Sequence, residues 1–283
     1  MTGRLPSPAE RVRARLRAAA GAQVAGAMPR GYQRIGSVLL LRLPPELAPY
    51  GRLLGEAWQE ELGVETVLAR TGPIDGELRH PRVERLAGDA TVTEVVEHGV
   101  RWRLDAARVM FAAGNRTERR RVAALVRPGE RIADLFAGIG YFAIPAALAL
   151  ARVAAVEKNP VAYRYLVENA ARNGVQDRLE PHLGDNRDVP LPRGAFDRVL
   201  LGYLPSAVPW IGRALELADP EGATVHVHLV VDARGALPRA REEVAAAVAR
   251  RGAQSAGPAR ARAVKPYGPG RTHVVVDAPV RAG

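Results

Sequence analysis

The run Asp134-Leu-Phe-Ala-Gly-Ile-Gly-Tyr-Phe142 decides the fold. It follows an apolar strand and opens a helix, so it reads as a strand-to-helix turn. Gly138 and Gly140 allow the backbone to approach a ligand closely there. Asp134 can orient the turn or reach a cationic amine, and Phe136 lies inside it. The run is shorter than the G-x-G-x-x-G of dinucleotide enzymes and is weak evidence alone.

Polar side chains at the ends of the next strands strengthen this interpretation. Glu157 ends the strand that follows, where an acid can accept both ribose hydroxyls. Asp185 and Asn186 follow the third strand, where they can accept from an adenine amino group and meet the ring edge. The run Gly202-Tyr-Leu-Pro205 follows the fourth, at the edge where the reacting group is expected.

Each of these residues also has a purely structural interpretation. Asp134 could cap a helix, Glu157 could pair with a surface arginine, and Asp185-Asn186 could form an Asx turn. It is improbable that all three structural interpretations hold together, one at each successive strand end. The pattern therefore favours a site for a nucleoside-containing cofactor.

Strands and helices alternate around this motif, which predicts a doubly wound, mainly parallel sheet of Rossmann type in an α/β domain. A hairpin is expected to close the domain, around the loop Lys265-Pro-Tyr-Gly-Pro-Gly-Arg271. The predicted strands are 131–136, 153–156, 179–182, 198–201, 224–231, 261–264 and 273–277. The predicted helices are 119–125, 141–150, 160–173, 207–218 and 236–251.

A small α+β module is expected before this domain. It contains predicted strands at 35–43, 65–69, 90–97 and 100–105 and a helix at 53–62. Ahead of it, 8–25 reads as a basic helix with Ser7 as its N-cap, interpreted as a solvated helix or tail in preference to an RNA-binding one. The predicted organisation is therefore an N-terminal helix or tail (1–30), a small α+β module (31–113) and a Rossmann-type α/β domain (114–283).

The amino-acid composition limits the classes of function that this chain can have. The chain has 283 residues and a net charge of +11, which suits a polyanionic partner but also fits an Arg-rich codon bias. It contains no cysteine, which excludes disulfides, thiolate nucleophiles and cysteine-bound metals. No apolar run is long enough to cross a membrane, and no signal peptide is recognisable, so we expect a cytoplasmic protein.

Beyond these patterns, residues 33–279 resemble the Trm5/TYW2 family of tRNA position-37 enzymes. One branch methylates N1 of guanosine 37, and the other (TYW2, or Taw2 in archaea) is the aminocarboxypropyltransferase of the wybutosine pathway. The resembling stretches are Ile35-Gly-Ser-Val-Leu, Gly76-Glu-Leu-Arg-His-Pro-Arg, Phe111-Ala-Ala-Gly-Asn-Arg-Thr-Glu-Arg119, the Asp134 motif, Glu157-Lys-Asn-Pro160 and Gly184-Asp-Asn-Arg-Asp188.

Two departures assign the branch. Methyltransferases of the family typically carry Asn-Leu-Pro or Asn-Pro-Pro after the fourth strand, whereas this chain has Gly202-Tyr-Leu-Pro-Ser206. They also carry an arginine, implicated in handling the guanine, where this chain has Gly114. At both positions the sequence of this chain is similar to that of the aminocarboxypropyl branch.

The resemblance implies S-adenosylmethionine as co-substrate, with no metal, and tRNA-Phe position 37 as the acceptor. It also implies that the module 31–113 positions the tRNA and that 114–283 is the S-adenosylmethionine-binding catalytic domain. The implied reaction transfers the 3-amino-3-carboxypropyl group to a 4-demethylwyosine-type base and releases methylthioadenosine. Methyl transfer to guanosine 37 is the alternative, and a noncatalytic RNA-binding protein is a further one. No obligate protein partner is evident, and a membrane partner is not expected.

The resemblance also distributes roles over the chain. Family members commonly have serine where this chain has Ala112, so only a backbone contact is expected there, while Arg119 suits the methionyl carboxylate. No general base is assigned. The expected cofactor contacts are Ala112, Arg119, Asp134, Phe136, Gly138, Gly140, Glu157, Lys158, Asp185 and Asn186. The expected acceptor-pocket residues are Gly202, Tyr203, Leu204 and Pro205, and the expected RNA contacts are Arg79, Arg82, Lys265 and Arg271.

Some of these residues have a second, structural interpretation that the sequence supports equally well. Tyr203 could be an ordinary stacking residue, and the Lys265–Arg271 loop could be a plain hairpin turn. His226 and His228 alternate along a strand and so share a face, but no third ligand is apparent. They are interpreted as core or substrate contacts in preference to a metal site.

Overall fold

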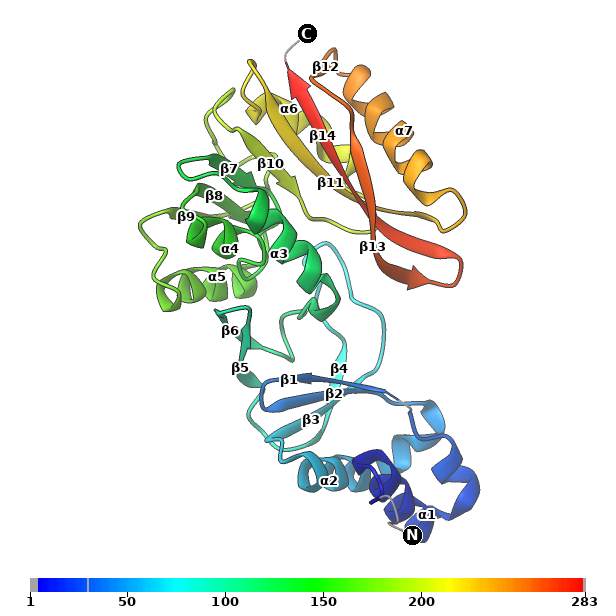
Figure 1. Ribbon diagram of the computed structural model, residues 1–283. Helices are drawn as coiled ribbons and strands as arrows, with labels where there is room; N and C mark the ends of the chain where they lie inside the picture. The colour runs from blue at the N-terminus through cyan, green and yellow to red at the C-terminus, as the bar shows by residue number, and fades with distance from the viewer. Residues whose placement is uncertain (1–4, 30, 282–283) are drawn as a thin grey trace. The chain divides into compact units, whose positions relative to one another are not determined.

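The computed structural model describes residues 5–29 and 31–281, which form two compact units (Figure 1). The first unit is Met1–Val96 with Trp102–Phe111, and the second is Glu97–Arg101 with Ala112–Gly283. Among the described helices, none combines the length and apolar character that crossing a membrane requires.

The first unit is a mixed sheet covered by helices. Its strands lie in the order β1-β2-β3-β4, with the β2–β3 pair parallel and the others antiparallel. Its elements are α1 (Pro8–Gly26), β1 (Tyr32–Ile35), β2 (Val38–Arg42), η1 (Pro45–Tyr50), α2 (Gly51–Leu62), β3 (Thr66–Arg70) and β4 (Val83–Ala87). A hairpin of β5 (Val92–Glu97) and β6 (Val100–Asp105) follows.

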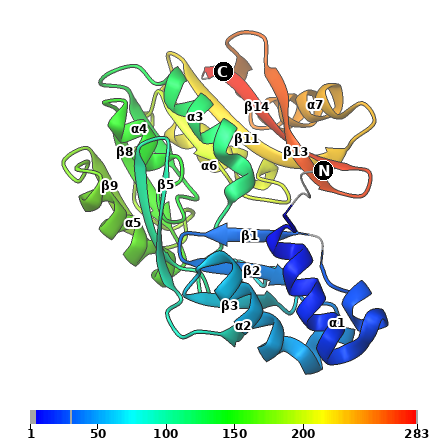
Figure 2. The same ribbon diagram turned by 60° about the horizontal axis from the view of Figure 1, so that its bottom comes forward.

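Parts of this unit differ from the sequence-based expectation, which included no strand at β4. The strand predicted at 35–43 is interrupted by a turn at Gly36, whose φ of 56° suits glycine, and β1 and β2 pair as a hairpin across it. The N-terminal helix is not a solvated tail. Ser7 caps α1 as expected, and Val12 and Leu16 are buried in the same core as α2, beside which α1 lies (Figure 2). The apolar positions on a helix that looked merely basic decide this packing.

The second unit is the expected Rossmann-type α/β domain. Its strand order is β12-β14-β11-β10-β7-β8-β9, with β13 paired to β14. The strands are β7 (Arg131–Asp134), β8 (Arg152–Glu157), β9 (Leu179–Leu183), β10 (Arg198–Leu201), β11 (Ala223–Asp232), β12 (Gln254–Ser255), β13 (Arg260–Gly268) and β14 (Arg271–Arg281). The helices are η2 (Ala113–Asn115), α3 (Arg116–Leu125), α4 (Ala143–Leu148), α5 (Pro160–Arg172), η3 (Val208–Trp210), α6 (Ile211–Leu217) and α7 (Ala236–Ala249).

Parallel pairing brings the functional strand ends to one edge. β10 pairs in parallel with both β7 and β11, and β8 pairs in parallel with β7 and β9. The carboxyl ends of β7, β8, β9 and β10 therefore lie side by side, as the sequence predicted. The C-terminal hairpin is longer than expected, and β14 runs antiparallel to β11 over its full length.

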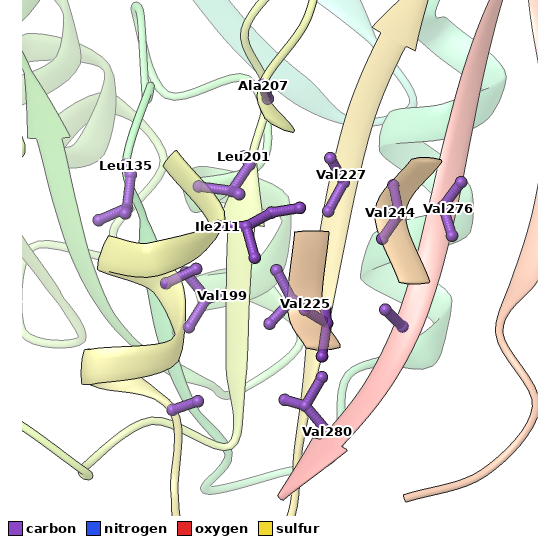
Figure 3. Close-up of a cluster of buried hydrophobic side chains, with 14 of the residues drawn as sticks. Leu135, Val199, Leu201, Ala207, Ile211, Val225, Val227, Val244, Val276 and Val280 are labelled. Atoms are coloured by element: carbon purple, nitrogen blue, oxygen red, sulfur yellow. The ribbon is translucent and has the colours of Figure 1, made fainter. Parts of the chain in front are cut away.

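A valine-rich core holds this sheet against α6 and α7. Val199, Val225, Val227 and Val276 point from neighbouring strands toward the two helices, where Ile211 and Val244 lie among them (Figure 3). All these side chains are buried. β-branched residues suit such a sheet face, and their close packing makes the strand ends a rigid platform.

Candidate active site

The first strand end carries a buried carboxylate with spare hydrogen-bonding capacity. Asp134 is fully buried, and its Oδ1 accepts from the Phe136 N–H at 3.3 Å. Its Oδ2 has no hydrogen-bond partner among the described residues. Burial raises the pKa of Asp134 to about 7, and the charge of Glu157 contributes to the rise. A buried acceptor without a partner is costly, so the site suits a ligand that brings a donor or a positive charge.

The glycine turn is tied to the second strand end. Glu157 accepts from the N–H of Gly138 through Oε2 and from the N–H of Asn159 through Oε1, both at 2.7 Å. Gly138 has a φ of 58° and Gly140 a φ of 102°, both in the left-handed region. A side chain at Gly140 would also meet Ile144 at 2.5 Å. The conformation and packing of the turn therefore require both glycines. The Glu157 carboxylate is hydrogen-bonded to this turn through the Gly138 N–H.

The third strand end presents an acid and an amide. Asp185 pairs with Lys158 at 2.9 Å and with Arg187 at 2.6 Å, and these cations hold its pKa well below the usual range. Asn186 donates through Nδ2 to the carbonyl of Leu135 at 3.1 Å, while its buried Oδ1 has no partner among the described residues. Asn186 thus joins this strand end to the first turn and keeps one acceptor open.

The fourth strand end carries an aromatic cluster. The ring of Tyr203 lies 5.1 Å from that of Phe136 and 5.0 Å from that of Trp210. Gly202 approaches the Phe142 ring, and the carbonyl of Pro205 accepts from the Val230 N–H at 2.7 Å. These rings are tilted or edge-on to one another, and a cluster of this kind with a polar edge suits contact with a flat heteroaromatic base. Trp210 was missed by the sequence analysis, because a lone tryptophan in a predicted helix carries no signal of its neighbours.

Arg119 lies in a buried electrostatic cluster. Its Nη2 pairs with Oε2 of Glu97 at 2.7 Å, and its guanidinium lies 4.9 Å from the centre of the Tyr141 ring. Arg116 pairs with the other oxygen of Glu97 at 2.6 Å. Burial lowers the pKa of Arg119, which the Glu97 charge partly offsets. The hydroxyl of Tyr141 hydrogen-bonds with the backbone of Ala112. Glu97 was missed, because only the fold brings its strand end to α3.

The four residues expected to contact RNA divide between the units. In the first unit, Arg82 pairs with Asp75 at 2.9 Å, and Arg79 lies against Met110 with a φ of 57°. In the second unit, Arg271 donates to the carbonyl of Val230, whereas Lys265 is partly buried over Gly114. RNA contact by these four residues stays a prediction. Lys265 lies in β13 and packs over Gly114, whereas we expected it in a loop.

The strand histidines belong to the buried core of the domain. His226 hydrogen-bonds with Asp277 at 2.6 Å and with Arg198 at 2.5 Å. His228 lies 3.0 Å from His273, and burial lowers the pKa of both, that of His273 to about 4. Throughout residues 5–29 and 31–281, no three His, Asp or Glu side chains gather as a group that could hold a metal ion.

Comparison with known proteins identifies the group to which this arrangement belongs. The family model described as the TRM5/TYW2 methyltransferase domain matches residues 93–254, and the TYW2 N-terminal domain matches residues 12–91. The chain belongs to the TRM5/TYW2 family. It is 41% identical to the tRNA(Phe) (4-demethylwyosine(37)-C(7)) aminocarboxypropyltransferase of Pyrococcus horikoshii, over 88% of this chain and 89% of that protein.

Solved structures of TYW2 proteins are similar to this chain over most of its length. The structure of P. horikoshii TYW2 in complex with MeSAdo has a TM-score of 0.83 and 35% identity, covering 97% of this chain and all of that one. The structure of Methanocaldococcus jannaschii TYW2 in complex with AdoMet has a TM-score of 0.72 and 31% identity, covering 89% of this chain and all of that one. The fold class and the family resemblance predicted from the sequence are therefore confirmed.

The strand-end residues fit an S-adenosylmethionine molecule by their chemistry. Glu157 offers carboxylate oxygens suited to ribose hydroxyls, and Asn186 offers an open acceptor beside Asp185 suited to adenine. The open Oδ2 of Asp134 suits a cationic amine. Acceptors of the right kind thus occur at three successive strand ends.

Proposed function

We propose that this protein transfers the 3-amino-3-carboxypropyl group of S-adenosylmethionine to C7 of 4-demethylwyosine at position 37 of tRNA-Phe. The observation that carries the proposal is the pairing of a nucleoside-type strand-end site with a TYW2 N-terminal domain on one chain. The P. horikoshii relative with this activity is similar over most of both chains. We expect the reaction to take place in the cytoplasm.

The proposed roles follow the strand ends. Glu157 binds the ribose, Asp185 and Asn186 bind the adenine, and Lys158 holds Asp185 in place through their 2.9 Å ion pair. Gly138 and Gly140 shape the turn beneath the cofactor, and Phe136 covers it. These assignments agree with the open acceptors on Asp134 and Asn186.

The acceptor base is proposed to enter at Gly202–Pro205. The Tyr203 ring packs with Phe136 and Trp210, which presents a preformed aromatic surface for a tricyclic base. Gly202 has no side chain to fill the space beside Phe142. These residues position the base, and none of their side chains acts as a strong base.

S-adenosylmethionine supplies a sulfonium-activated γ-carbon when bound. A carbon–carbon bond forms between that γ-carbon and C7 of the base as the γ-carbon–sulfur bond breaks. The electron pair of the broken bond stays on sulfur, so methylthioadenosine leaves as a neutral molecule. The C7 proton passes to solvent, which restores the aromatic ring.

The proposal is tested with S-adenosylmethionine labelled separately in its methyl and carboxyl carbons. Each is incubated with the protein and tRNA-Phe carrying either 4-demethylwyosine or guanosine at position 37. We expect carboxyl label in the precursor-bearing tRNA alone. Methyl label in guanosine-bearing tRNA would instead assign the chain to the methyltransferase branch, and binding of tRNA without transfer or cofactor binding would mark a noncatalytic RNA-binding protein.

A further inference from the structure

Lys265 occupies an unusual position for a lysine in a C-terminal hairpin. It lies in β13 and is partly buried, packed over the backbone of Gly114. A β-carbon placed on Gly114 would lie 2.7 Å from its Nζ and 2.9 Å from its Cδ. The missing side chain at 114 therefore makes the room in which the Lys265 ammonium lies.

The surroundings of this ammonium are short of negative charge. Arg119 is near enough to lower the pKa of Lys265 by repulsion, in addition to the larger effect of burial. Glu97 pairs with Arg119, but Arg116 already takes its other oxygen. The Lys265 side chain forms no ion pair and no hydrogen bond within residues 5–29 and 31–281, although its backbone lies in the β13–β14 ladder. Partly buried charges are normally paired, so this cluster suits one further anion.

The family resemblance already implies that Arg119 binds the methionyl carboxylate. We infer that Lys265 joins Arg119 in binding the carboxylate of the aminocarboxypropyl arm, and that Gly114 is small in order to admit the Lys265 ammonium. This inference rests on the proposed function, because the proposed function identifies the arm that the two cations bind. A carboxylate held here would fix the end of the chain that is transferred. Anchoring that end restricts the rotation of the arm and so helps to present its γ-carbon to the base.

The decisive experiment compares two ligands that differ in the arm. S-adenosylmethionine carries the carboxylate, whereas methylthioadenosine has the same adenosine and sulfur without it. We would measure the binding of each by calorimetry, without tRNA, to the wild type and to K265M. We expect K265M to lose about tenfold or more in affinity for S-adenosylmethionine and to bind methylthioadenosine unchanged. Unchanged binding of the shorter ligand also reports that the variant is folded.

Three companion variants sharpen the result. R262M removes an exposed cation from the same strand and should leave both affinities unchanged. K265R keeps the charge and should recover part of the lost affinity. G114A should displace the ammonium and reproduce the selective loss seen with K265M.

Two outcomes would overturn the inference. K265M could weaken both ligands equally, which would give Lys265 a structural role. It could also leave both affinities intact while weakening tRNA binding, which would assign the cation to an RNA phosphate. Because these measurements require no transfer, they are independent of whether the labelled-donor assay supports aminocarboxypropyl or methyl transfer.

Discussion

The carboxylate of Glu97 and the guanidinium of Arg119 form a buried ion pair, with Oε2 and Nη2 2.7 Å apart and 4% of each side chain exposed. The two residues lie 22 positions apart in the sequence, at the end of β5 and in α3. Tyr141, from the run that decides the fold, lies beneath the guanidinium. The ion pair therefore fixes Arg119 beside the turn that we propose binds the cofactor.

Replacing Glu97 by alanine should destabilise the protein strongly. The change leaves the buried Arg119 without the carboxylate that offsets its desolvation, which costs about 3 kcal/mol in comparable buried pairs. Denaturant unfolding of E97A measures this loss. The matched control is E168A, which breaks a more exposed pair with Arg172 and should change the free energy of unfolding by less than about 1 kcal/mol. Equal effects of the two variants would contradict the structural role of Glu97.

The Asp134 carboxyl should make stability depend on pH without ligand. Its pKa is about 7 in the folded protein against an ordinary 3.8, so the folded state binds more protons between these values. Stability from this group is therefore complete below about pH 4 and is lost as the pH rises through about 7.

The substitution D134N should remove this pH dependence. The free energy of unfolding of D134N minus that of the wild type should become more positive from pH 5 to pH 8, by about 3 kcal/mol. Urea unfolding of the ligand-free proteins across this range provides the measurement. Parallel pH profiles would mean that Asp134 does not have a raised pKa.

Two glycine substitutions distinguish the cost of an unfavourable backbone conformation from the cost of a steric clash. Gly140 and Gly174 both have positive φ values, of 102° and 65°. A side chain at Gly140 meets Ile144 at 2.5 Å and Leu166 at 3.2 Å, whereas a side chain at Gly174 meets nothing within 4 Å. We expect G174A to cost about 1 kcal/mol and G140A at least about 2 kcal/mol, measured by thermal unfolding. A larger cost for G174A than for G140A would contradict the packing of the turn.

Local patterns predicted the second unit well, because its elements carry their own signals. Asn159 and Pro160 mark the start of α5, and the Asn159 side chain accepts from the N–H of Val161 and that of Ala162. The apolar runs of β8 and β10 are buried on both faces, as parallel central strands require. Glu157 and Gly202 could be named from the sequence since each ends or follows such a run, whereas Asp185 and Asn186 follow β9, which is only partly buried.

The remaining features depend on contacts between distant segments. A turn at Gly36-Ser37 lies near the start of the strand predicted at 35–43, and β4 has an exposed, weakly patterned sequence that gave no signal. Glu97 and Lys265 acquire their meaning only when β5 and β13 bring them to Arg119 and Gly114. Sequence spacing contains no information on these pairings.

The central claim is that the aminocarboxypropyl group, and not the methyl group, leaves the sulfur. The most direct measurement is chromatographic identification of the adenosine-containing product after a single turnover on tRNA-Phe bearing 4-demethylwyosine. The account predicts methylthioadenosine in an amount equal to the precursor consumed. S-adenosylhomocysteine as the product would contradict it.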